Sequence, residues 1–99
     1  MPQEISSLGI GWYNREDYPR ILQIMEDAHV LPPTYDVWRK KAEGLESQVK
    51  ASGAAVVVRA IIKPEEFVAW CASRGMKVDA KARTAFGSEF VYRSVNGKN

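Results

Sequence analysis

Two short segments of this chain, 49 residues apart, follow the same pattern and constrain its fold more than any other feature. Residues 13–18 read Tyr-Asn-Arg-Glu-Asp-Tyr, and residues 62–67 read Ile-Lys-Pro-Glu-Glu-Phe. In each segment a large apolar residue ends a predicted strand, two acids begin a helix, and an aromatic residue follows. Internal repeats of this kind indicate the architecture of a chain before any single residue does. We therefore expect an α+β fold with strand–helix–helix repeated in residues 8–52 and 54–93, and a small two-stranded sheet packed against four helices.

The length and composition are those of one small soluble domain. Ninety-nine residues are enough for a single core, and we expect only residues 1–7 and 95–99 to be flexible. No run approaches the roughly 20 apolar residues that span a bilayer, and the start of the chain lacks the basic and apolar regions of a secretory signal. The single cysteine, Cys71, excludes an intrachain disulfide and a cysteine-rich zinc site. We expect a cytoplasmic protein.

The first predicted strand covers residues 8–13. Leu8, Ile10 and Trp12 alternate with Gly9 and Gly11, which is the two-residue period of a strand. The glycines leave one face of this strand without side chains, so a helix or another backbone can approach it closely.

The second predicted strand covers residues 55–62, which are rich in β-branched side chains and lie between Gly53 and Pro64. Both of its faces are apolar apart from Arg59, so it needs cover on both sides. Because it is too apolar for an exposed edge, we also expect the chain to form a homodimer.

Four helices are predicted, over residues 17–28, 34–52, 64–75 and 79–92. The second is the clearest, because Trp38, Ala42, Leu45 and Val49 form one apolar stripe. Its polar face includes Glu46, which is spaced to pair with Lys50 one turn later. The fourth helix contains Gly87, which we attribute to a close contact with another helix.

No set of residues requires a particular catalytic chemistry. His29 lies near the end of a predicted helix without a suitable partner, and Cys71 is in phase with Phe67 on an apolar helix face. The paired acids at residues 16–17 and 65–66 are typical of helix starts. Since no spaced set of His, Cys or carboxylate residues predicts a metal site, we assign no catalytic residue, metal or cofactor.

Positive charge is concentrated in the second half of the chain. Residues 1–50 carry 6 Lys or Arg against 8 Asp or Glu, whereas residues 51–99 carry 8 against 4. The candidate nucleic-acid-binding residues are the cations around the turn between the third and fourth helices, together with one on the second strand: Arg59, Arg74, Lys77, Lys81 and Arg83.

Aromatic residues are the main candidates for partner binding, since Trp, Tyr and Arg dominate interface energetics. Core packing accounts for most of the large aromatic side chains. Tyr13 and Arg15 lie at the end of the first strand, outside the periodic stripes, and we expect them to contact a partner together with Trp70.

Residues 55–93 resemble the ribbon–helix–helix class of DNA-binding regulators. The shared features are a strand, a Pro-Glu-Glu helix start, an Arg-Gly turn and a second helix. The resemblance implies DNA binding. However, only Arg59 offers a polar side chain on the strand, and the second helix begins Val-Asp-Ala-Lys, without the usual Ser/Thr/Asn-Arg start.

More of the chain resembles a family of small uncharacterised bacterial proteins of unknown function. These carry Trp-Tyr-x-Arg-Glu-Asp-Tyr, here residues 12–18, and Ala-Trp-Cys-x-x-Arg-Gly, here residues 69–75. The resemblance implies a bacterial, cytoplasmic origin and brings no functional residues with it.

Our leading hypothesis is a small non-enzymatic interaction module that acts through protein–protein contacts. A good core and many aromatic residues, without convergent reactive groups, favour this interpretation. The alternatives are a DNA-binding regulator of the ribbon–helix–helix type and an enzyme with an unrecognised site.

Overall fold

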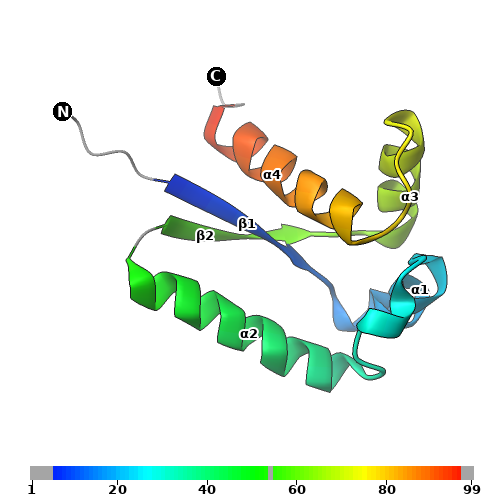
Figure 1. The fold of residues 1–99 in the computed structure, drawn as a ribbon, viewed down its shortest axis with the longest axis horizontal. Coiled ribbons are helices and arrows are strands. Elements are labelled where there is room, and N and C mark those ends of the chain that lie inside the picture. The colour runs from blue at the N-terminus through cyan, green and yellow to red at the C-terminus, as the bar shows by residue number, and fades with distance from the viewer. Residues whose placement is uncertain (1–5, 54, 97–99) are drawn as a thin grey trace.

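The computed structural model describes residues 6–53 and 55–96, and its fold is α+β (Figure 1). Two strands and four helices are present as predicted. The elements, in chain order, are β1 (Ser6–Trp12), the 3-10 turn η1 (Arg15–Asp17), α1 (Tyr18–Ile24), the 3-10 turn η2 (Ala28–Val30), α2 (Tyr35–Ser52), β2 (Ala55–Ile61), α3 (Pro64–Ser73) and α4 (Ala80–Asn96).

The two halves are not exact copies, because both 3-10 turns occur in the first half. The helix expected over residues 17–28 ends at Ile24, since Met25 takes an extended backbone conformation. At the chain ends, β1 begins at Ser6 and α4 continues to Asn96, so both elements extend into segments that we expected to be flexible. The rest of that expectation falls on residues 1–5 and 97–99, outside the described part of the chain.

The two strands pair in parallel within one chain, with Gly9 opposite Val58. A parallel pair requires a crossover connection, which α1 and α2 supply here. The sheet formed by the described residues has two strands, so the outer edges of both β1 and β2 are without a partner strand in it.

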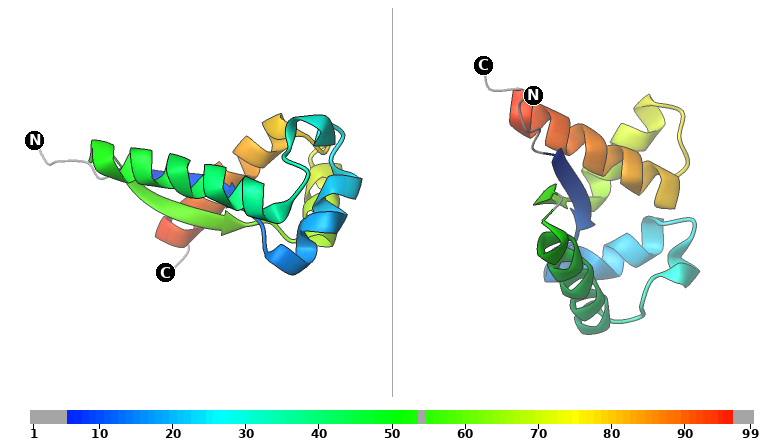
Figure 2. Two further views of the ribbon diagram at one scale, coloured as in Figure 1. Left: turned by 90° about the horizontal axis from the view of Figure 1, so that it is seen from below. Right: turned by 60° about the vertical axis from the view of Figure 1, so that its left-hand side comes forward.

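Helices cover both faces of this sheet. Figures 1 and 2 show α2 and α4 running along the strands on opposite sides, with α1 and α3 grouped at the end where the strands finish. This cover satisfies the two apolar faces of β2, as predicted from its sequence. Within residues 6–53 and 55–96, every helix is too short or too polar to cross a bilayer.

The glycines of β1 allow α4 to approach the sheet closely. A Cβ atom on Gly9 would lie 2.3 Å from the carbonyl oxygen of Gly87, and one on Gly87 would lie 2.9 Å from the carbonyl oxygen of Gly9. The bare strand face predicted from Gly9 is therefore confirmed. The close contact predicted for Gly87 exists too, but its partner is a strand and not a helix.

The helix ends follow the local sequence signals. The Thr34 hydroxyl accepts a hydrogen bond from the Val37 amide at the start of α2, and Gly53 ends that helix with φ +70°. Pro64 begins α3 at the position where no N–H is required. The Asp79 carboxylate accepts a hydrogen bond from the Ala82 amide at the start of α4.

The core is rich in aromatic side chains. One group packs α2 onto the end of β1 and onto α1: Trp12, Tyr13, Tyr18, Tyr35 and Trp38. A second group joins α3 to α4: Phe67, Trp70, Phe86 and Phe90.

The stripe predicted for α2 is only partly buried. Trp38 and Ala42 are in the core, but Leu45 is 49% exposed. Glu46, predicted on the polar face, is instead buried and forms two hydrogen bonds with Arg59 of β2, at 2.8 Å each. The predicted stripe was wrong at Leu45 and Glu46, because α2 is rotated so that its contact with the sheet includes a charged pair.

Candidate functional site

An open groove of about 500 Å³ runs along the outer edge of β1, between α2 and α4. Its floor is the backbone of Gly9, Ile10 and Gly11. The α2 wall consists of Trp38, Lys41, Ala42 and Leu45, and the α4 wall consists of Ala80, Arg83 and Thr84. Leu8 at one end, and Tyr13, Leu31 and Pro32 at the other, complete the lining. We call this the β1 groove.

Apolar side chains in the β1 groove remain in contact with water. Leu8 is 43% exposed and Leu45 is 49% exposed, and they line the same hollow. Concave apolar surfaces with a few polar groups are typical of binding sites, whereas isolated exposed apolar residues are not.

The backbone at the floor of the groove offers hydrogen-bonding groups to a ligand. The carbonyl oxygen of Trp12 accepts a hydrogen bond from the Ile62 amide, so Trp12 faces β2. Alternate residues of a strand direct their N–H and C=O groups to opposite edges. Gly9 and Gly11 therefore face away from β2. In the described part of the chain, neither glycine forms a backbone hydrogen bond of a turn, loop or cap, although the carbonyl oxygen of Gly9 lies against Gly87 of α4.

One end of the β1 groove is closed by hydrogen bonds. The Tyr35 hydroxyl donates to the carbonyl oxygen of Tyr13 at 3.0 Å, and the Tyr18 hydroxyl donates to the carbonyl oxygen of Pro32 at 2.6 Å. Burial raises the pKa of Tyr13 to about 12. Tyr13 is therefore a neutral phenol at physiological pH and gives the groove a rigid end instead of an ionisable group.

The two cations of the groove have different roles. Arg83 donates two hydrogen bonds to Asp27, at 2.8 and 3.0 Å, and both side chains are mostly buried. Lys41 is exposed, and no ion pair holds it among the described residues. Lys41 is therefore the cation that is available to a ligand.

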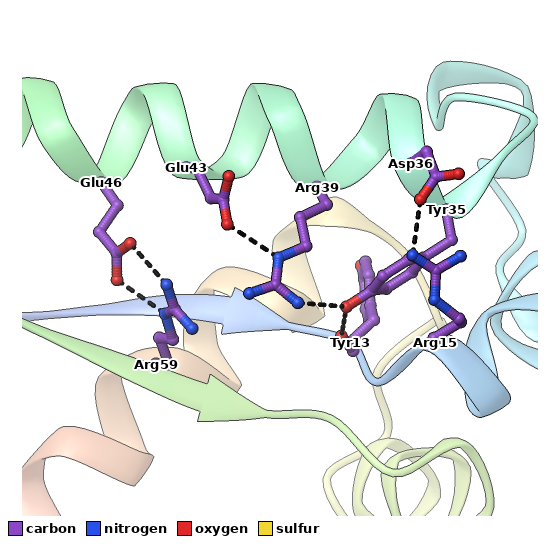
Figure 3. Close-up of polar contacts among 8 residues, drawn as sticks. All are labelled: Tyr13, Arg15, Tyr35, Asp36, Arg39, Glu43, Glu46 and Arg59. Atoms are coloured by element: carbon purple, nitrogen blue, oxygen red, sulfur yellow. Dashed lines mark hydrogen bonds and ion pairs between the residues drawn. The ribbon is translucent and has the colours of Figure 1, made fainter.

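The other side of α2 carries a neutral belt of ion pairs, shown in Figure 3. Three arginines each bond to a carboxylate of α2: Arg15 to Asp36, Arg39 to Glu43 and Arg59 to Glu46. The arginines also lie over aromatic rings; the Arg59 guanidinium is 3.9 Å from the centre of the Trp12 ring. The Arg59–Glu46 pair joins α2 to β2, whereas Arg15–Asp36 joins α2 to η1 and Arg39–Glu43 lies within α2. Because its charges are balanced, the belt offers little to an anionic ligand.

The predicted partner-binding residues do not form one site. Tyr13 is buried, which corrects the expectation that it faces a partner, although its ring lines the end of the β1 groove. Arg15 is exposed but bonded to Asp36. Trp70 is partly buried and donates a hydrogen bond to Glu89, outside the β1 groove. The aromatic residues at this strand end serve the core because they pack against one another.

The predicted nucleic-acid-binding residues are also dispersed. Arg59, Arg74 and Arg83 are bonded to Glu46, Glu89 and Asp27 respectively. Lys77 and Lys81 are exposed near the start of α4. Three of the five positive charges are thus balanced by a carboxylate at hydrogen-bonding distance.

His29 and Cys71, the residues considered for catalysis, have different surroundings. His29 is exposed in η2, whereas Cys71 is buried in α3. Burial, together with Asp79, raises the pKa of the Cys71 thiol, which disfavours a reactive thiolate. Within the described residues, His, Cys, Asp and Glu form no group of three that could hold a metal ion.

Few sequence signals point to the β1 groove. The alternating glycines of residues 9 and 11 were a signal for close approach, but not for which edge of the strand would stay open. No sequence pattern distinguishes Lys41, and the apolar stripe of α2 predicts Leu45 in the core. No family model, curated protein or solved structure matches this chain.

Proposed function

We propose that this chain is a small, non-enzymatic, cytoplasmic interaction module that binds a partner protein in the β1 groove. One observation carries the proposal: the edge of β1 that has no partner strand among the described residues forms the floor of an apolar groove between two helices. Binding there would cover Leu8 and Leu45 and would satisfy backbone groups of a strand edge, which is a recurrent mode of protein recognition.

The charge distribution favours this proposal over a DNA-binding regulator. Affinity for DNA comes mainly from cations that are free to contact phosphates. Of the five candidates, only Lys77 and Lys81 are not bonded to a carboxylate among the described residues. Phosphate binding does not use an apolar groove, so the β1 groove also favours a protein partner over DNA.

Site-specific photo-cross-linking tests the proposal. A photoreactive benzoylphenylalanine replaces Leu45 in the groove, and in a matched control it replaces Val37, which is 47% exposed on the same helix but does not line the groove. Both variants are irradiated in an extract of cells of the organism whose genome encodes the protein. Both sites are exposed, so thermal unfolding should show that each variant folds.

We expect a discrete cross-linked product from position 45 and none from position 37. A second change, Thr84→Arg at an exposed position of the α4 wall, should remove the product because it fills the hollow with a charged side chain. Equal products from both positions, or a product that persists with Arg at position 84, would contradict binding in the groove.

A further inference from the structure

We infer that the occupant of the β1 groove is an extended segment of the partner that pairs with β1 as a third strand and places an acidic side chain at Lys41. This inference rests on the proposed function, because it specifies how that same groove recognises its partner. Its basis is the geometry of the strand edge, the shape of the groove and the charge of its lining.

The strand edge favours an extended occupant over a helical one. Gly9 and Gly11 direct their backbone N–H and C=O groups away from β2, but the carbonyl oxygen of Gly9 lies against Gly87 of α4. The edge therefore offers an extended segment two donors and, at Gly11, one acceptor. An extended segment can pair with these groups, whereas the backbone groups of a helix are already bonded within the helix. Tyr13 ends the available edge, because its carbonyl oxygen is already bonded to the Tyr35 hydroxyl.

The shape of the groove favours a single segment over the same strand of a second copy. The edge of β1 lies between α2 on one side and α4 on the other (Figure 1). A second β1 strand would bring its own α2 and α4 to the groove, whereas a single extended segment has no flanking helices to accommodate.

The walls determine the sequence pattern of the occupant. Side chains of a paired strand point alternately to the two faces of the sheet. On the α2 side they meet Trp38, Ala42 and Leu45, which favour apolar side chains. On the α4 side they meet the small residues Ala80 and Thr84.

Charge complementarity predicts that the occupant carries an acidic residue. Lys41 is the cation of the groove that no carboxylate holds among the described residues, and the lining contains no acid. A carboxylate on the occupant would complete an ion pair at the rim of the groove. Rim charges affect specificity and association rate more than affinity, so the acid should select among apolar strands without being their main source of binding energy.

A displayed library of random 12-residue peptides, selected on the immobilised full chain, provides the probe. Synthetic copies of the enriched sequences are then measured by calorimetry against the native chain and against Leu45→Arg. We expect enriched peptides with alternating apolar residues and an acid. We also expect Leu45→Arg to abolish their binding, whereas Val37→Arg should leave it unchanged.

Backbone methylation of these peptides tests strand pairing directly. A methyl group on an amide that faces β1 removes one hydrogen bond and adds bulk, so it should weaken binding about tenfold or more. Methylation of the next amide along, which faces away from β1, should have little effect. This alternation is the signature of an added strand, and a helical peptide would not produce it.

The role of Lys41 is tested by a double-mutant cycle. Lys41→Gln and replacement of the peptide acid by its amide should each weaken binding about threefold, and the two changes together should cost no more than one alone. Lys40→Gln is the matched control, since Lys40 is exposed next to Lys41 but does not line the groove.

The outcomes separate this inference from the function on which it rests. Peptides whose binding depends on Leu45 but not on alternate backbone amides would overturn strand pairing and leave a binding groove. Additive effects in the cycle would overturn the role of Lys41. If no peptide is enriched, or if the enriched peptides bind the Leu45→Arg variant as tightly as the native chain, peptide recognition in the groove is overturned.

Discussion

Gly9 is the residue at which an added methyl group should destabilise the folded protein most. In Gly9→Ala the new Cβ would lie 2.3 Å from the Gly87 carbonyl oxygen and 2.7 Å from a methyl carbon of Val91. The shortest contact is with the backbone of Gly87, which cannot move without displacing α4. We therefore expect a loss of about 3 kcal/mol in the free energy of unfolding, which urea denaturation would measure.

Gly44 provides the matched control at the same scale. It lies within α2, and a Cβ there would meet no atom within 4 Å. Gly44→Ala should stabilise the protein by about 0.5–1 kcal/mol, because alanine has the higher helix propensity. If the two alanine variants unfold at the same urea concentration, the close contact between β1 and α4 is not what stabilises the fold.

At the scale of elements, Asp27 joins the segment after α1 to the start of α4. Its carboxylate accepts two hydrogen bonds from Arg83 and one from the Ala80 amide. The Arg83 guanidinium holds the pKa of the Asp27 carboxyl below its usual range. A carboxyl whose pKa is lowered by folding stabilises the protein above its unfolded pKa of about 4, and this contribution is lost as the pH falls through the lowered value.

Asp27→Asn should therefore destabilise the protein by about 1–3 kcal/mol at pH 7. The difference from the native chain should shrink as the pH falls below 4 or so, toward the lowered pKa of Asp27. Urea denaturation at a series of pH values measures both effects. Asp36→Asn is the control, since the Asp36–Arg15 pair is exposed and should contribute little. A difference that stays constant with pH would contradict the pairing with Arg83.

At the scale of the whole molecule, the open question is what covers the outer edge of β2. The sheet of the described residues ends there, and Val56 is 52% exposed. Apolar edge strands tend to pair with other chains. We predict a homodimer formed through β2, which light scattering after size-exclusion chromatography at high protein concentration would detect.

Val56→Lys should convert that dimer to a monomer, because a lysine on an edge strand opposes pairing. Val37→Lys, at a similarly exposed position on α2, should leave the dimer intact. A native chain that elutes as a strict monomer at high concentration would overturn this prediction. The β1 groove lies at the opposite edge of the sheet, so the dimer and the groove can be tested separately.

The elements of the fold followed from local sequence signals. The β-branched run of β2, the cap residue Thr34 and the prolines at the first turns of α1 and α3 act over a few residues, so their effect can be read without knowing the fold. The same reasoning placed Cys71 in the core and anticipated the close approach to Gly9.

The candidate site did not follow from such signals. Whether Leu45 faced the core or the groove, and whether Glu46 faced water or Arg59, depended on a rotation of α2 that no local pattern specifies. Likewise, the position of Tyr13 outside the periodic stripes predicts partner contact, but its ring packs against Tyr18 and against Trp38 from the distant helix α2.

The sequence by itself determined which segments of this protein form helices and strands, because caps, prolines, glycines and apolar periodicity act on neighbouring residues. Only the tertiary structure decided which strand edge stays open, which charges are balanced and where the β1 groove lies. Those properties arise when residues far apart in the chain meet, and they depend on how whole elements pack against one another.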